Sequence, residues 1–205
     1  MNKVRMGVIA ALIGAMAAGS ARANDATEIN ARRDAVTVDN KISGPITGGA
    51  GYFIRVRSTF DYDAKATSTF ALADLTAKVG SGIDAVVEAQ VFPDQSTHLR
   101  AGAQYFRSLG KDASVYALGT FDVGGDHDAE ILVSARATPR IADGLSAKLG
   151  VETVTDIDKG VSYATQRWRA GIQRDGYSVG LALDTTQMPG TSPSYAPGIF
   201  LQKDF

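Results

Sequence analysis

The feature that most constrains this 205-residue chain is an alternation of apolar and polar residues that begins near residue 51 and continues to the C-terminus. In its first segment, Ile54 and Val56 alternate with Arg55 and Arg57. A period of two is typical of strands, whose successive side chains point to opposite faces of a sheet. About ten such segments follow one another, and short turns containing Gly and Asp join them. The pattern therefore predicts an antiparallel meander.

A meander of this size leaves unpaired edges unless it closes on itself. We therefore predict an all-β fold, a closed antiparallel up-and-down transmembrane β-barrel of about ten strands, with eight and twelve as open alternatives. After the N-terminal apolar stretch, no run approaches the roughly 18 apolar residues that a membrane-spanning helix needs. If the chain spans a membrane it must then do so as a barrel, because only helices and closed barrels satisfy their backbone groups in lipid.

The N-terminal region divides in two before the barrel begins. Residues 1–23 are predicted to be a signal peptide, because Lys3 and Arg5 precede an apolar stretch and a small-x-small pattern ends at Ala23. Residues 24–49 are polar and end in Gly-Pro and Gly-Gly steps, so they are predicted to form a periplasmic tether or plug segment. Residues 50–205 are then the β-barrel.

Composition excludes two classes of function. The chain carries 21 basic and 22 acidic residues, so no excess of positive charge attracts a nucleic acid, and none is predicted as a partner. It has no cysteine, which excludes disulfides and thiol chemistry.

Two orientations of the barrel wall remain open. A soluble lipocalin-like barrel turns its apolar face inward around an apolar ligand, whereas a membrane barrel turns that face toward lipid and encloses the polar face. Here the polar face carries charges at mid-strand, as expected when opposite charges compensate one another across a narrow lumen. The predicted lumen charge network comprises Arg55, Arg57, Glu88, Arg100, Glu130, Arg136, Lys148, Glu152, Arg167 and Arg169.

Aromatic residues on the apolar face lie near the strand ends, with Ala, Val, Leu and Ile between them. Two such bands are typical of the girdles at the two surfaces of a bilayer, which favours the membrane orientation. The predicted aromatic girdle comprises Tyr52, Phe60, Tyr62, Tyr105, Phe121, Tyr177 and Phe205.

The export signal, the alternating strands and a final strand that ends in Phe205 together resemble the small bacterial outer-membrane β-barrel proteins. The resemblance covers residues 51–205 and is one of pattern. It implies a location in the bacterial outer membrane, contact with its lipid and lipopolysaccharide, and recognition of Phe205 by the barrel-assembly machinery. Lys203 on the outer face and Pro197 near the strand start depart from the pattern, but lysine can snorkel and proline is tolerated where a strand begins.

Candidate catalytic groups are few, and the chain is predicted not to be an enzyme. The alternative is a rim hydrolase or acyltransferase that uses His98 or His127 as a general base. No cofactor is predicted. Carboxylates in the connections are candidates for a divalent cation, although Asp also suits turns. These metal candidates are Asp126, Asp128, Asp156 and Asp158.

On the predicted lumen face, Arg residues outnumber Glu residues, and fixed positive side chains favour anions in a pore. The sequence therefore predicts a small outer-membrane barrel with a structural role or a narrow, weakly anion-preferring channel. One alternative is a soluble secreted or periplasmic lipocalin-like barrel that binds an apolar ligand. The other is an outer-membrane enzyme that modifies lipid or hydrolyses a substrate.

Overall fold

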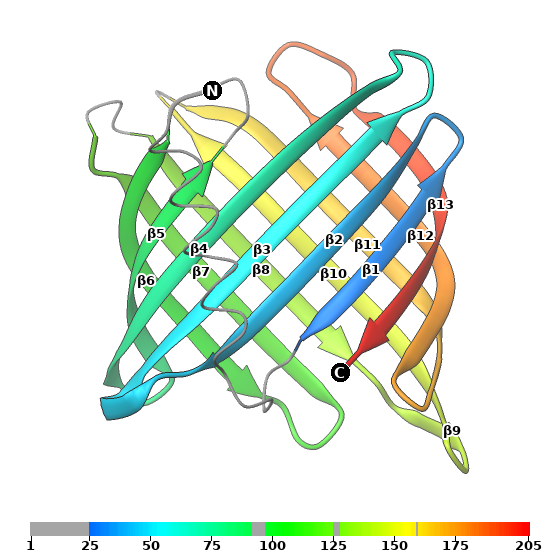
Figure 1. Ribbon diagram of the computed structural model, residues 1–205, viewed down its shortest axis with the longest axis horizontal. Helices are drawn as coiled ribbons and strands as arrows, with labels where there is room; N and C mark the ends of the chain where they lie inside the picture. The colour runs from blue at the N-terminus through cyan, green and yellow to red at the C-terminus, as the bar shows by residue number, and fades with distance from the viewer. Residues whose placement is uncertain (1–24, 92–96, 125–127, 159) are drawn as a thin grey trace.

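The computed structural model describes residues 25–91, 97–124, 128–158 and 160–205 and shows a closed antiparallel β-barrel (Figure 1). No helix within these ranges is long and apolar enough to cross a membrane. One short 3-10 helix, η1 (Thr47–Gly49), lies in a turn. The strands are β1 (Ala26–Arg32), β2 (Ala35–Pro45), β3 (Ala50–Asp61), β4 (Ala66–Gly80), β5 (Ile83–Val91), β6 (His98–Ser108), β7 (Ala113–Asp122), β8 (Ala129–Ala137), β9 (Arg140–Ala142), β10 (Leu145–Ile157), β11 (Val161–Arg174), β12 (Tyr177–Gln187) and β13 (Ser194–Asp204).

The barrel closes because the first strand pairs with the last. Sequential neighbours are antiparallel from β1 to β8, β8 pairs with β10, and β10 to β13 continue to β1, so twelve strands within the described ranges form the ring. The three-residue β9 is an added strand that pairs with the start of β10. The closed antiparallel up-and-down prediction is confirmed. Residues 50–205 supply ten of the ring strands, and the ring has twelve because two more precede them.

The prediction that residues 24–49 form a tether or plug is wrong, because β1 and β2 lie in this segment and belong to the barrel wall. In β2, Val36 and Val38 alternate with Thr37 and Asp39, the same period of two that marks the later strands. The segment is short and rich in charge, which conceals that pattern. The predicted signal peptide lies outside the described residues.

The two faces of the wall have opposite chemistry. Leu181 on β12 is 69% exposed on the outer face, whereas Glu88 on β5 is 0% exposed on the inner face. Other large apolar side chains exposed on the outer face are Leu75, Val87, Leu99, Val133, Leu149, Trp168, Val179 and Leu201. A lipocalin-like barrel needs the reverse arrangement, with an apolar interior, so this geometry does not fit that alternative.

Two glycines let the wall bend around one buried aromatic ring. A Cβ added at Gly180 would lie 2.2 Å from the carbonyl oxygen of Ala170, so no larger residue fits there without a backbone shift. Gly171 on β11 is directly opposite Gly180 and is equally restricted. Phe200 on β13 is directly opposite Gly180 on the other side and is 1% exposed, so it fills the space that the glycines leave.

Lys203 and Pro197, which depart from the outer-membrane pattern, are each accommodated by their neighbours in the structure. Lys203 Nζ lies 3.9 Å from the centroid of the Tyr177 ring and donates to the Asp175 carbonyl at 3.0 Å, so its charge is held at the barrel end. Pro197 pairs with Leu183 on β12 but lies beyond the end of β1, which begins to pair at Gly198. Its missing N–H therefore costs no hydrogen bond to β1.

The connections divide between two ends of the barrel. The end that holds the start of β1, the end of β13 and the turns at 46–49, 81–82, 109–112 and 175–176 is here named the terminal rim. The end that holds the connections at 33–34, 62–65 and 188–193, together with the last residues of β5, β7 and β10, is named the loop rim.

Candidate functional site: the charged lumen

The strand register places all ten predicted lumen charges on the inner face of the wall. Asp39 is directly opposite Arg57, Glu88 opposite Arg100, and Glu152 opposite Arg167, so each pair shares the inner face. Alternation along β3, β8, β10 and β11 puts the remaining residues on the same face, and these are Arg55, Glu130, Arg136, Lys148 and Arg169.

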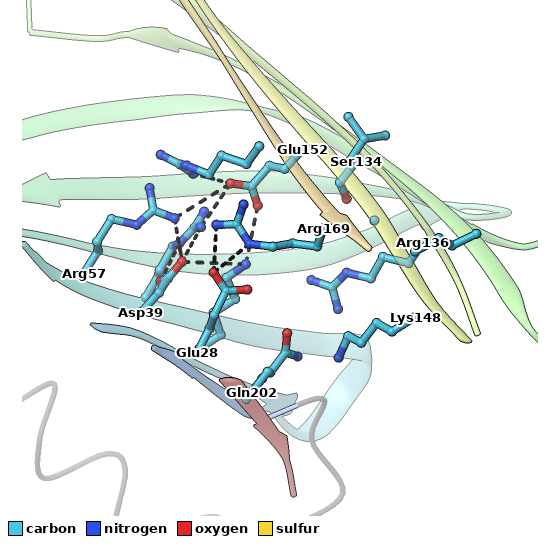
Figure 2. A pocket seen from close by; sticks show the side chains of 16 residues that line it. Glu28, Asp39, Arg57, Ser134, Arg136, Lys148, Glu152, Arg169 and Gln202 are labelled. Carbon is cyan, nitrogen blue, oxygen red and sulfur yellow. Dashed lines mark hydrogen bonds and ion pairs between the residues drawn. The ribbon is translucent and has the colours of Figure 1, made fainter. Parts of the chain in front are cut away.

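The centre of the lumen is crossed by a set of ion pairs, here named the ionic bridge, formed by Asp39, Lys41, Arg55, Arg57, Glu152 and Arg167. Arg55 Nη2 lies 2.6 Å from Asp39 Oδ2 and 3.0 Å from Glu152 Oε1. Arg167 also donates to Glu152, and Lys41 Nζ lies 3.4 Å from Glu152 Oε2. Figure 2 shows these contacts converging on Glu152 and Asp39.

The ionic bridge joins opposite walls of the barrel. Arg55 lies on β3 and Glu152 on β10, and five ring strands separate them in either direction. The two side chains are 5% and 14% exposed, so the contact is largely shielded from water. A charge pair that spans the ring at this depth narrows the passage and fixes the two walls relative to each other.

A second group of ion pairs lies beside the bridge, where β11 and β12 face β1. Arg169 donates to Glu28 at 2.8 Å and to Asp184 at 2.7 Å. Asp184 also accepts from Asn30 at 3.1 Å and from Arg32 at 3.5 Å. These contacts fasten β1 to β11 and β12 across the inner face.

On the remaining wall, from β4 to β8, acidic side chains outnumber basic ones on the inner face of the described residues. Asp74 is directly opposite Glu88, and both are buried. Gln90 Nε2 donates to Glu88 at 2.9 Å and lies 3.5 Å from Glu130 Oε1, so the amide links these two carboxyl groups. The three carboxyl groups of Asp74, Glu88 and Glu130 are named here the carboxyl cluster.

Toward the loop rim, the acidic wall ends in two polar pairs. Arg100 Nη1 donates to both oxygens of Asp128 at 3.0 Å, and His98 Nδ1 lies 3.0 Å from Asp122 Oδ2.

Among the described residues, no group of three or more His, Cys, Asp or Glu is arranged to hold a metal ion. Asp128 is instead held by Arg100, Asp158 bonds through its backbone to Ser162, and Asp126 and His127 lie outside the described residues.

A small cavity of about 80 Å³ lies between the ionic bridge and the inner face of β8 and β10. Seven basic and three acidic side chains line it, so its lining carries an excess of positive charge. The charged residues that line it are Glu28, Asp39, Lys41, Arg55, Arg57, Arg136, Lys148, Glu152, Arg167 and Arg169. This volume has room for a few water molecules.

Arg136 differs from the other basic residues of this cavity because it forms no ion pair with the described residues. It is exposed within the lumen, and no ion pair within the described part of the chain holds its guanidinium. Gly150, which has no side chain, is directly opposite it on β10, and Arg169 is opposite Gly150 on β11. In Figure 2, Arg136 points toward the ionic bridge from the other side of the cavity, whereas Lys148 Nζ pairs with Asp204 at 2.9 Å.

The predicted girdle residues lie toward the two rims. Phe60, Tyr62 and Phe121 lie near the loop rim, and the rings of Phe60 and Tyr62 meet edge to face at 5.8 Å. Toward the terminal rim lie Tyr52, Tyr105, Tyr177 and Phe205.

Sequence reasoning missed several carboxylates of the lumen. Asp39, like the basic Lys41 beside it on the inner face, lies in the segment predicted to be a tether, although the alternation with Val38 and Ile42 was a usable signal. Asp74 lies on a strand whose inner face also carries Phe70 and Leu72, which blurs the alternation there. Because these acids were missed, the predicted excess of Arg over Glu overstates the positive charge of the whole lumen, and the excess is local to the cavity.

Comparison with known proteins identifies the fold. No protein-family model and no curated protein matches this sequence. Among solved structures, the KdgM porin matches with 10% sequence identity over 88% of this chain and 98% of that chain, with a TM-score of 0.54. The KdgM porin in complex with disordered oligogalacturonate matches over the same shares with 10% identity and a TM-score of 0.51. The resemblance to small outer-membrane β-barrel proteins is thus confirmed at the level of the fold.

Proposed function

We propose that this chain is a bacterial outer-membrane barrel that acts as a narrow, weakly anion-preferring channel. The apolar outer face and the charged inner face support insertion in lipid, because a closed barrel leaves no unpaired backbone edge in the bilayer. The aromatic residues near both rims suit the two bilayer surfaces. With the terminal rim toward the periplasm, the loop rim faces the cell exterior and contacts lipopolysaccharide.

The observation that carries the anion preference is the lining of the lumen cavity. Seven basic side chains face three acidic ones there, and Arg136 extends into the cavity without an ion-pair partner among the described residues. Fixed positive charge at a constriction favours the passage of anions. The KdgM porin, which shares this fold, has been seen in complex with oligogalacturonate. That neighbour supports a channel role here, while the preference rests on the cavity itself.

We also propose that the barrel is not an enzyme. The His98–Asp122 pair has the geometry in which a carboxylate orients an imidazole. It also fastens the start of β6 to the end of β7 at the loop rim, which gives the pair a structural role. Asp122 additionally accepts from the backbone N–H of Gly124 at 2.5 Å and so shapes the turn that follows β7.

Arg136→Ala is expected to reduce the preference for anions. In planar bilayers with a salt gradient, the ratio of anion to cation permeability should fall by roughly twofold, because the substitution removes one fixed positive charge from a narrow passage. Arg140→Ala is the matched control, since Arg140 lies on β9 outside the cavity and pairs with Asp143. An equal change in both variants would contradict the role of the cavity, and silent recordings from the wild-type barrel would leave a structural role in place of the channel.

Deletion of Phe205 is expected to impair assembly rather than folding. Phe205 is 75% exposed, and its backbone N–H donates to the Asp25 carbonyl at 3.0 Å. An exposed terminal side chain is available to the assembly machinery, so the deletion should lower the amount of folded barrel in cell membranes while refolding in detergent stays efficient. Phe205→Tyr, which keeps the aromatic ring, should assemble like the wild type. Equal loss in cells and in detergent would show a structural role instead.

A further inference from the structure

The carboxyl cluster places three acids together on the inner wall with little positive charge beside them. Asp74 on β4 and Glu88 on β5 are directly opposite each other and are 2% and 0% exposed. Glu130 approaches from β8 through Gln90, which lies within reach of both Glu88 and Glu130. Carboxylates buried together in this way repel one another unless a cation or a proton joins them.

The nearest cation does not neutralise the cluster. Arg100 on β6 lies 3.8 Å from Glu88, measured from Nε to Oε1. Its Nε donates to Thr120 at 3.0 Å, and its Nη1 holds Asp128, so its hydrogen bonds go to other partners. The positive charge of Arg100 is therefore shared with a carboxylate outside the cluster.

The basic side chains that lack an ion pair on the described parts of β4 and β8 are Lys78 and Arg136. They lie toward the terminal rim, four residues from Asp74 and six residues from Glu130 along their strands. On β3, the residue opposite Asp74 is the apolar Phe53, and Arg55 is engaged in the ionic bridge. On β7, the Tyr116 hydroxyl donates to Gln104 at 3.0 Å, and Asp122 pairs with His98. The inner faces of β5 and β10 add the carboxyl groups of Asp84 and Asp156.

Each member of the central pair keeps one buried oxygen that no donor from the described residues reaches. These atoms are Asp74 Oδ1 and Glu88 Oε2. A buried carboxylate oxygen without a donor is unfavourable, and two facing carboxylates cannot both stay ionised. A proton between the two groups removes both problems, because it neutralises one acid and lets its O–H donate to the other.

We propose that Asp74 and Glu88 form a proton-binding site that holds one shared proton at neutral pH. A proton fits better than a metal ion, because no three acidic or His side chains of the described residues, those of the carboxyl cluster included, are arranged to hold a metal ion. The site stands whether or not the barrel conducts. If the barrel does conduct, loss of the proton at alkaline pH adds one negative charge to the lumen and weakens the preference for anions.

Infrared spectroscopy of the folded barrel in detergent tests the site directly. The wild type should show the carbonyl stretch of a protonated carboxyl group at neutral pH, and the band should disappear on alkaline titration. Asp74→Asn and Glu88→Gln should each remove the band. Asp84→Asn is the matched control, because Asp84 faces the same lumen but accepts from Gln104 Nε2 at 3.0 Å, and this variant should keep the band.

The remaining outcomes also decide the proposal. Absence of the band in the wild type, or its survival in both pair variants, overturns it. If Glu130→Gln is the one variant that loses the band, the proton belongs to Glu130 and the proposed Asp74–Glu88 site is overturned. Thermal unfolding is a second measurement. The folded pair keeps a proton that an unfolded carboxyl group releases, so the free energy of unfolding of the wild type should fall as pH rises. Asp74→Asn, whose amide can donate in place of the proton, should fold and lose this dependence, whereas stabilisation of the wild type by Na⁺, K⁺ or Ca²⁺ without the band would indicate a metal site.

Discussion

Glu152→Ala should open the lumen and raise single-channel conductance severalfold. Glu152 accepts from Arg55, Lys41 and Arg167, and it is the β10 end of the ionic bridge. Without this carboxylate, Arg55 keeps Asp39 on its own side of the barrel but loses its contact with the opposite wall. The passage between β3 and β10 then widens, because the pair that crosses it no longer forms.

The same substitution should destabilise the barrel. Removing one partner of a buried ion pair lowers the free energy of unfolding by about 3–5 kcal/mol, because the other charge stays buried. Lumen water partly reaches Glu152, so the loss in this variant should lie near the lower end of that range. Heating before gel electrophoresis measures the loss as a lower temperature at which the compact folded band disappears. Glu152→Gln is the matched control, since its side chain keeps the volume and an acceptor oxygen, and it should fall between alanine and the wild type. Unchanged conductance in a folded Glu152→Ala barrel would show that the ionic bridge does not limit the passage.

Leu181→Arg should prevent stable insertion of the barrel. Leu181 lies in the middle of β12 with its side chain 69% exposed on the outer face. If this face meets lipid, an arginine near the middle of the bilayer costs about 2–4 kcal/mol, a large part of the stability of a small barrel. The measurement is the yield of heat-modifiable folded protein in lipid vesicles.

A control with the same charge on the other face makes this test specific. Ser134→Arg introduces arginine on the inner face, where Ser134 is directly opposite Glu152. The new cation therefore has a carboxylate nearby, and the variant should fold in vesicles. If Leu181→Arg folds as well as Ser134→Arg, the outer face does not contact lipid, and the proposed location in the outer membrane is wrong.

The alternation of residues determined more of this protein than its low similarity to known sequences would suggest. Arg55, Glu88 and Glu152 could be placed on the inner face from their spacing alone, because side chains along a strand alternate between the two faces of the sheet. The same rule placed Tyr177 and Leu181 on the outer face. It failed for residues 26–45, where charged residues and a short length obscured a genuine period of two.

Partners across the lumen could not be predicted in the same way. Arg55 and Glu152 are 97 positions apart, and nothing in the spacing of either strand selects one for the other. Asp74 and Glu88 lie on neighbouring strands, but only the burial of both, together with the engagement of Arg100 by Asp128, shows that their charges lack compensation. Counting Arg against Glu along the chain therefore overstated the positive charge of the lumen and could not show that the excess is confined to the cavity.

The sequence by itself determined the class of fold, the face of the wall on which the side chains of the clearly alternating strands lie, and the approximate number of strands, because these depend on local periodicity and short turns. The tertiary structure decided that residues 26–45 belong to the wall, that the ionic bridge joins β3 to β10, and that Arg136 and the carboxyl cluster lie on different parts of the inner face. Those features depend on closure of the ring, which sets the distances between strands that are remote in the chain and so selects which charges meet.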